Sequence, residues 1–146
     1  MAEFTHFKKD GSAVMVDVHE KPDTYRAASA TGTIQVSPEV FAAVRDHTAK
    51  KGDVLGVARL AGIMGAKKNA ELIPLCHIVP LTNCEVTFTT DENTNSITAV
   101  CTTSCVGKTG VEMEALTGVS TALLTIYDMC KAMDRGMVIR DLHILE

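Results

Sequence analysis

The alternation of apolar and polar side chains predicts several short strands. Residues 14–18 and 25–36 are rich in Val, Thr, Ile and Tyr and have no helical period, so each is expected to be a strand. Apolar and polar residues alternate over 84–89 and again over 97–102, with turn-forming residues between them. This pattern predicts an antiparallel hairpin. A last strand is expected over residues 137–145.

Helix signals follow the second predicted strand. Ser37 and Pro38 are typical of a helix start, and this helix should run to about His47. Lys50-Lys51-Gly52 predicts a turn, after which Asp53 can cap a second helix. Three glycines in that helix predict close packing against another backbone, because each of them weakens an isolated helix. Its apolar stripe comprises Val54, Val57, Ala58, Ala61 and Met64, and its glycines are Gly56, Gly62 and Gly65.

A third and longer helix is predicted nearer the C-terminus. Thr109 and Glu112 fit a capping box, in which both side chains bond to backbone amides at the helix start. Gly136 predicts the end of the helix near Arg135. Its apolar stripe comprises Leu116, Val119, Leu123, Ile126 and Cys130. Two prolines keep the segment 71–81 out of a helix or a central strand.

The order of these elements predicts an α+β fold. It contains the succession βαββαβ, which is the ferredoxin-like sandwich of an antiparallel sheet with helices on one face. No repeat or linker divides the 146 residues, so a single domain over 1–146 is expected. Such a sheet leaves one face uncovered unless subunits pair over it, and we therefore expect a homo-oligomer.

Charge and composition exclude several classes of function. The net charge of −4 gives no broad basic field for nucleic acid or anionic lipid. The most apolar stretch, Val54 to Ala66, is too short to cross a bilayer, and the N-terminus lacks a signal-like apolar run, so a cytoplasmic protein is expected. The five cysteines are odd in number and contain no C-x-x-C pair, which argues against a disulfide framework and a zinc ribbon.

Several residues that could carry chemistry also have a structural explanation. Gly107-Lys108-Thr109-Gly110 invites comparison with a phosphate loop, but Thr102 stands where a Walker loop needs its first glycine. The capping box alone accounts for Glu112. Asp128 and Lys131 are three positions apart on the predicted helix, which is also the spacing of an ordinary surface ion pair.

His77 and Cys76 are candidates in the irregular segment. Adjacent residues on an extended chain point to opposite sides, and no second His or Cys pair has ligand spacing, so no metal site is expected. The structural alternative for His77 is a hydrogen-bonded histidine without a catalytic role. Cys101 and Cys105 share one face of their strand and are expected in the core.

The acidic residues of the long helix are widely separated. Glu112 and Glu114 point in directions about 200° apart, so they are expected to do different jobs. Glu114 and Asp128 share one face, which should oppose the apolar stripe, but about 21 Å of helix lies between them. Both can serve one site only if the ligand is long, or if symmetric subunits bring the two ends together.

Five segments of the chain match a known family in order. They are Met15-Val16-Asp17-Val18, Lys50-Lys51-Gly52-Asp53, Leu72-Ile73-Pro74-Leu75-Cys76-His77, the run from Lys108 to Thr117 and the run from Thr125 to Ala132. Together they closely resemble the cyclic pyranopterin monophosphate synthases, which form the molybdenum cofactor biosynthesis protein C family. Ile78 departs from the family pattern, because many relatives have proline there.

The resemblance implies a ferredoxin-like fold and a homohexamer built as a trimer of dimers, with active sites shared across the dimer interface. It also implies a reaction. The cyclised GTP intermediate (8S)-3′,8-cyclo-7,8-dihydroguanosine 5′-triphosphate is converted to cyclic pyranopterin monophosphate with release of diphosphate. No cofactor is expected.

The resemblance also implies roles for individual residues. Asp128 is the expected catalytic acid/base, and Lys51 and Lys131 are the expected catalytic lysines. A carboxylate such as Glu114 can accept hydrogen bonds from a guanine edge, and cations can hold a triphosphate. The expected substrate-binding residues are Leu75, Cys76, His77, Met113, Glu114, Glu112 and Arg26.

Two other classes of function remain open at this point. The fold also hosts modules that bind a nucleotide without turning it over, so fold alone does not decide for an enzyme. A thiol-dependent or zinc protein is the third possibility. The discriminating feature is Asp128 beside Lys131 and Lys51, because a sensor has no need of a proton-transfer carboxylate next to a lysine.

Overall fold

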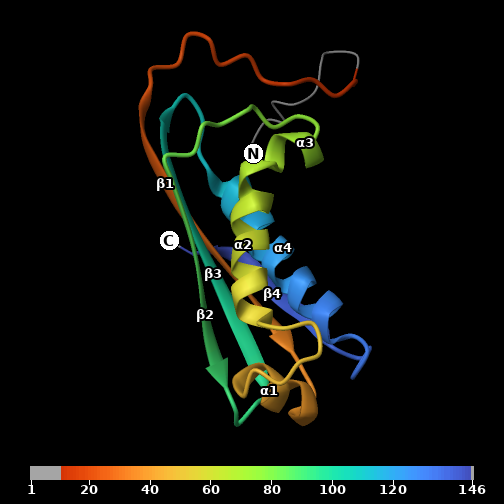
Figure 1. Ribbon diagram of the computed structural model, residues 1–146. Coiled ribbons are helices and arrows are strands. Elements are labelled where there is room, and N and C mark those ends of the chain that lie inside the picture. Colours follow the sequence, from red (N-terminus) through yellow and green to blue (C-terminus); the bar gives the residue numbers. More distant parts are fainter. Residues whose placement is uncertain (1–10, 146) are drawn as a thin grey trace.

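Four antiparallel strands form one sheet, and helices cover one of its faces (Figure 1). The computed structural model describes residues 11–145. The strands are β1 (Thr24–Gln35), β2 (Asn83–Asp91), β3 (Ser96–Gly107) and β4 (Val138–Leu145). The helices are α1 (Pro38–Arg45), α2 (Val54–Lys67), α3 (Asn69–Leu72) and α4 (Glu112–Cys130). The sheet order β2-β3-β1-β4 confirms the predicted ferredoxin-like α+β fold.

The N-terminal segment differs from the prediction. Residues 14–18 form no strand and lie outside the sheet. The His77 ring instead donates a hydrogen bond from Nε2 to the Val16 carbonyl at 2.6 Å, and this bond ties the segment to the irregular stretch that follows α3. Val16 and Val18 of this segment line a cavity together with that stretch instead of pairing in the sheet.

Two of the three predicted helix caps are confirmed. Ser37 Oγ accepts from the Val40 amide at 3.2 Å, and Asp53 Oδ1 accepts from the Gly56 amide at 3.1 Å. The third is wrong, because α4 follows Val111 and has no side-chain cap. Val111 is fully buried and its carbonyl accepts from the Thr103 hydroxyl at 3.0 Å, so this buried contact, which Thr109 does not share, fixes the helix start.

The helix ends also shift from their expected positions. α1 ends at Arg45, two residues before His47. α4 ends at Cys130, and the chain then makes turns before β4, so the expected end near Arg135 is wrong. The short helix α3 occupies the first part of the segment that the prolines were expected to keep irregular, although residues 73–82 contain no helix or strand.

The contact between α2 and α4 is made by glycines. A Cβ atom at Gly62 would lie 3.0 Å from the Gly118 carbonyl oxygen, and one at Gly118 would lie 3.2 Å from the Gly62 carbonyl oxygen. The predicted stripe of α2 is therefore wrong in part, because Val57 and Met64 are exposed while the glycine face is buried. The buried residues of α2 are Val54, Ala58, Gly62, Gly65 and Ala66.

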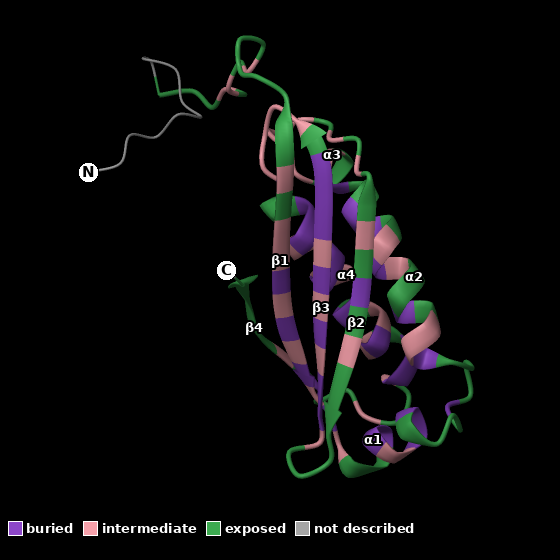
Figure 2. Ribbon diagram, turned by 90° about the vertical axis from the view of Figure 1, so that its left-hand side faces the viewer, coloured by how far each residue is buried: buried purple, intermediate pink, exposed green. Residues whose placement is uncertain are grey.

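One face of the sheet is left uncovered by helices (Figure 2), and hydroxyl groups of β1 and β3 form hydrogen bonds in the middle of this face. Ser29 Oγ and Thr102 Oγ1 lie 2.8 Å apart across β1 and β3, and Thr33 Oγ1 and Thr98 Oγ1 lie 2.9 Å apart. Thr31 donates to the Ala99 carbonyl at 3.0 Å. These polar groups satisfy one another, while Tyr25 and Val106, which pair across β1 and β3 nearer the end of the same face, are exposed apolar side chains.

Membrane-spanning helices are absent from the described part of the chain, residues 11–145, where no helix is both long and apolar enough to cross a bilayer.

Replacing Gly65 by Ala is expected to lower the free energy of unfolding by about 1–3 kcal/mol, the usual effect of overpacking. The added Cβ would lie 2.7 Å from Thr121 Cβ, so the two helices would have to move apart. Urea unfolding measures the change. Val57→Ala, on the exposed side of the same helix, is the control and should change stability by less than about 0.5 kcal/mol. A Gly65→Ala protein that gained the roughly 1 kcal/mol of alanine's helix propensity would contradict this close contact.

Candidate functional site

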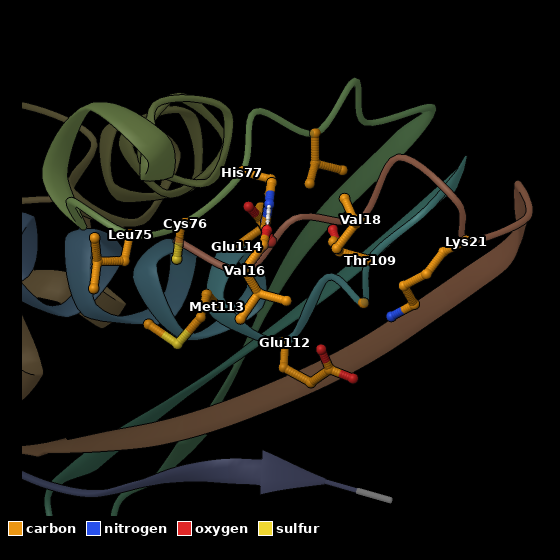
Figure 3. Close-up of a pocket in the computed structure, with 12 residues that line it drawn as sticks. Val16, Val18, Lys21, Leu75, Cys76, His77, Thr109, Glu112, Met113 and Glu114 are labelled. Carbon is orange, nitrogen blue, oxygen red and sulfur yellow. Dashed lines mark hydrogen bonds between the residues drawn. The ribbon is translucent and has the colours of Figure 1, made fainter. Parts of the chain in front are cut away.

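A cavity of about 260 Å³ opens beside the first turn of α4 (Figure 3). Three parts of the chain line it. The N-terminal segment contributes Val16, Val18 and Lys21; the loop after α3 contributes Leu75, Cys76, His77 and Val79; and the approach to α4 with its first turn contributes Thr109, Gly110, Glu112, Met113 and Glu114. Six of the seven residues expected to bind substrate thus lie around one cavity.

Cys76 and His77 both line this cavity, so the expectation that they point away from a common site is wrong. The loop is irregular here, and the strict alternation of an extended strand does not apply to it. His77 keeps its proton on Nε2 because that atom donates to the Val16 carbonyl. The hydrogen bond joins two walls of the cavity, as Figure 3 shows.

Glu114 is buried, with only 4% of its surface exposed. The Asn69 amide donates to its Oε2 atom at 3.1 Å. Burial raises the pKa of Glu114 above the ordinary value and the nearby Glu112 carboxylate raises it further, while hydrogen bonds, including the one from Asn69, act in the opposite direction. The expectation that Glu114 opposes the apolar stripe is therefore wrong: it lies on the face of α4 that meets the rest of the protein.

Glu112 also faces this cavity, and it is exposed. Its structural explanation fails, because Thr109 does not cap the helix and no capping box forms. Although Glu112 and Glu114 point in different directions around α4, the cavity wraps around the first turn and includes both. Two carboxyl groups, one exposed and one buried, are thus available to donors on a ligand.

A second cluster lies at the opposite end of α4. Lys131 Nζ donates to Asp128 Oδ1 at 2.8 Å, and Lys51 Nζ lies 3.7 Å from Asp128 Oδ2. Lys51 also donates to the Asp128 carbonyl at 3.3 Å. The hydrogen bond from Lys131 lowers the pKa of Asp128, and the charges of both lysines lower it further. The three side chains remain 43–58% exposed, so a ligand can reach them.

Arg26 lies near the first cluster but does not line its cavity. Its guanidinium donates to the carbonyls of Gly107 at 3.4 Å and Lys108 at 3.3 Å. Lys108 in turn donates to the Lys21 carbonyl at 2.8 Å and lies 3.7 Å from an Asp23 oxygen. These contacts hold the strand ends together and give Lys108 a structural partner.

The expected site residues thus form two separate groups within this chain. The catalytic candidates gather around Asp128, and the substrate-binding candidates gather around Glu114. The rise of an α-helix puts these two residues about 21 Å apart along α4. The turn that carries Lys51 precedes α2, which runs antiparallel to α4, and this places Lys51 beside the far end of α4.

Sequence reasoning missed several cavity residues. Val16 and Val18 lie in a segment interpreted as a strand, and Lys21 follows it. The segment's resemblance to the family was the available signal. Asn69 was also missed, since nothing in its sequence neighbourhood indicates that its amide is buried against Glu114.

The cysteines form no disulfide in the described residues. Cys101 and Cys105 are fully buried, which confirms the expectation that they belong to the core. Cys84 Sγ lies 3.8 Å from Cys101 Sγ. Between residues 11 and 145 no group of three or more His, Cys, Asp or Glu side chains is arranged to hold a metal ion.

A family model described as the MoaC family matches residues 15–146. The chain belongs to the MoaC family. Nearly the whole sequence is covered, including both clusters and the N-terminal segment that lines the cavity. Membership makes this protein an enzyme of molybdenum cofactor biosynthesis.

Glu114→Gln is expected to change how stability depends on pH. Because folding raises the pKa of Glu114, the wild-type protein loses stability as pH rises from the ordinary value of 4.5 through the raised value. The glutamine variant lacks this ionisation, so its stability relative to wild type should increase over that interval. Urea unfolding at about pH 4 and about pH 7.5 measures the difference.

The exposed Glu71→Gln variant is the matched control for this measurement. A Glu114→Gln protein whose stability relative to wild type is the same at both pH values, or falls as pH rises, would contradict the assignment of a buried carboxyl whose pKa is raised by folding.

Proposed function

We propose that this MoaC-family protein converts (8S)-3′,8-cyclo-7,8-dihydroguanosine 5′-triphosphate to cyclic pyranopterin monophosphate and releases diphosphate, as a lyase. The observation that carries the proposal is the position of the Asp128 carboxylate between two ammonium groups, 2.8 Å from Lys131 and 3.7 Å from Lys51. Family membership identifies the pathway as molybdenum cofactor biosynthesis. The side chains of the cluster are suited to bind phosphate and to transfer protons in a step of that pathway.

Lys51, Asp128 and Lys131 are assigned to the triphosphate and to proton transfer. Two exposed ammonium groups attract phosphate oxygens and can donate charge-assisted hydrogen bonds to them. A carboxylate beside a lysine can hold that lysine charged for phosphate, or exchange its proton as the ring rearranges. A module that only senses a nucleotide would need the cations, but it would not need Asp128 between them.

The cavity beside Glu114 is assigned to the guanine-derived ring. The Glu114 carboxyl accepts hydrogen bonds, which suits the ring N–H and exocyclic amine of a guanine edge. Leu75 and Met113 offer apolar contact to the ring, and Cys76, His77 and Glu112 complete the lining. Arg26 uses two of its five N–H donors on backbone carbonyls and keeps the others for phosphate.

The separation of the two clusters supports a shared site. About 21 Å of α4 lies between Glu114 and Asp128, too far for the base and the phosphates to be held as one compact unit by a single chain. A second subunit related by a twofold axis would bring the Glu114 end of one chain to the Asp128 end of the other. The separation therefore supports sites at a dimer interface, and the family resemblance extends this proposal to a hexamer built as a trimer of dimers.

Lys51→Ala and Lys131→Ala are each expected to lower turnover of the cyclised triphosphate by at least about 100-fold, as for a lost acid/base group. Residues that act as one unit are not additive, so the double variant should be little worse than the poorer single variant. Binding, measured by calorimetry, should suffer less than diphosphate release because other cations remain. Lys50→Ala, at the exposed neighbour of Lys51, is the control and should keep near wild-type turnover.

Near wild-type turnover in both single variants, or losses that simply multiply in the double variant, would contradict the proposed unit. Wild-type protein that binds the cyclised triphosphate without releasing diphosphate would favour the sensing module instead.

A further inference from the structure

A buried side-chain amide belongs to Asn69, the first residue of α3, which follows α2 after Lys68. Asn69 is 1% exposed, and both ends of its side-chain amide form hydrogen bonds with α4. Its Nδ2 atom donates to Glu114 Oε2 at 3.1 Å, while its Oδ1 atom accepts from the Thr117 hydroxyl at 2.6 Å. Both polar atoms of this buried amide therefore have a hydrogen-bond partner on α4.

The orientation of the Asn69 amide follows from these partners. An ionised carboxylate only accepts hydrogen bonds, so the amide NH₂ must face Glu114. The Thr117 hydroxyl can donate to the opposite atom, Oδ1, and it does so at short distance. A flipped amide would put its oxygen against the carboxylate, which the charge of that carboxylate disfavours.

The same residue connects two walls of the cavity. Its carbonyl accepts from the Ile73 amide at 2.9 Å and so fixes the start of the loop that carries Leu75 to His77. Its side chain holds Glu114 on the opposite wall. Thr117 lies three residues after Glu114, one turn along the same face of α4. The two hydrogen bonds of the Asn69 side chain therefore both join it to one rigid helix.

We propose that Asn69, oriented by Thr117, is a positioning residue for recognition of a guanine-type base by Glu114. Asn69 holds one carboxylate oxygen, so that the carboxyl group stays aimed at the cavity and accepts from the exocyclic amine and ring N–H of the base. The inference rests on the proposed function, because it concerns the same cavity, and it names the feature of the base that is recognised.

A base that lacks the exocyclic amine cannot donate that hydrogen bond to the Glu114 carboxylate. GTP and ITP differ only in that amine, so they probe this contact without any chemical step. Wild-type protein should bind GTP more tightly than ITP by roughly 10- to 100-fold, the range expected for one hydrogen bond to a charged group. Asn69→Ala should reduce this preference to about threefold or less, since an unheld carboxylate can turn away from the base.

Calorimetric titration of the full chain with GTP and with ITP measures the ratio of the two Kd values. Thr117→Val is a second test that leaves Asn69 in place but removes the hydroxyl that orients it. Ser120→Ala is the matched control, because it also removes an α4 hydroxyl, one that donates to the Leu116 carbonyl at 2.8 Å. The preference for GTP should fall in Asn69→Ala and Thr117→Val and persist in Ser120→Ala.

A purely structural role for Asn69 would weaken GTP and ITP equally and leave the ratio unchanged, and this result would overturn the inference. If wild-type protein releases diphosphate from the cyclised triphosphate and prefers GTP, but both variants keep that preference, the proposed function stands and the inference fails. If wild-type protein shows no preference, the assignment of the base to this cavity fails and the inference fails with it.

Discussion

The close antiparallel contact between α2 and α4 brings residues from distant parts of the sequence to both ends of α4. Gly62 and Gly118 have no side chain, so the two backbones approach until a Cβ at either position would be crowded. With this contact fixed, the turn before α2 meets the end of α4, where Lys51 reaches Asp128. At the other end of α2, Asn69 lies beside the start of α4 and donates a hydrogen bond to Glu114. Side chains larger than a hydrogen atom at the contact would move both ends at once.

One face of the sheet packs against this helix pair, and the other face is uncovered. Its inner face supplies small apolar side chains, which suits a protein with few aromatics and no tryptophan. Its outer face carries hydroxyl groups that bond across strands, including Ser29 with Thr102. Hydroxyl groups occupy the middle of this face, and its exposed apolar pair, Tyr25 and Val106, lies nearer one end. The stronger reason to expect an oligomer is the separation of the two clusters along one rigid helix.

The four strands of the sheet and two helix caps could be predicted because their signals are local, whereas the strand expected over residues 14–18 does not form. Ser37 and Asp53 each satisfy an amide three residues away, and the alternation in β2 and β3 reflects burial on one side of a sheet. The buried face of α2 could not be predicted from apolar periodicity, because the partner helix selects the glycines over Val57 and Met64. The start of α4 depends on a contact between Thr103 and Val111 that forms only in the folded chain.

In the candidate site, too, contacts between residues close in sequence could be predicted, whereas contacts between distant residues could not. Asp128 and Lys131 are three positions apart, so their pairing follows from helix geometry. Lys51 is 77 positions from Asp128, and only the family resemblance associated the two before the structure did so by distance. The cavity around Glu114 draws on residues from three separate segments, one of which was expected to be a strand. Tertiary contacts of this kind leave no periodic signal in a single sequence.

The most direct test of this account is complementation between variants damaged at opposite ends of α4. Glu114→Gln and Lys131→Ala subunits, each weakly active alone, are unfolded together in equal amounts and refolded. If each site takes the Glu114 end from one chain and the Lys131 end from another, random pairing makes about one quarter of the sites intact, and turnover should recover to about that fraction of wild type. A mixture no more active than the two variants measured separately would contradict a site shared between subunits.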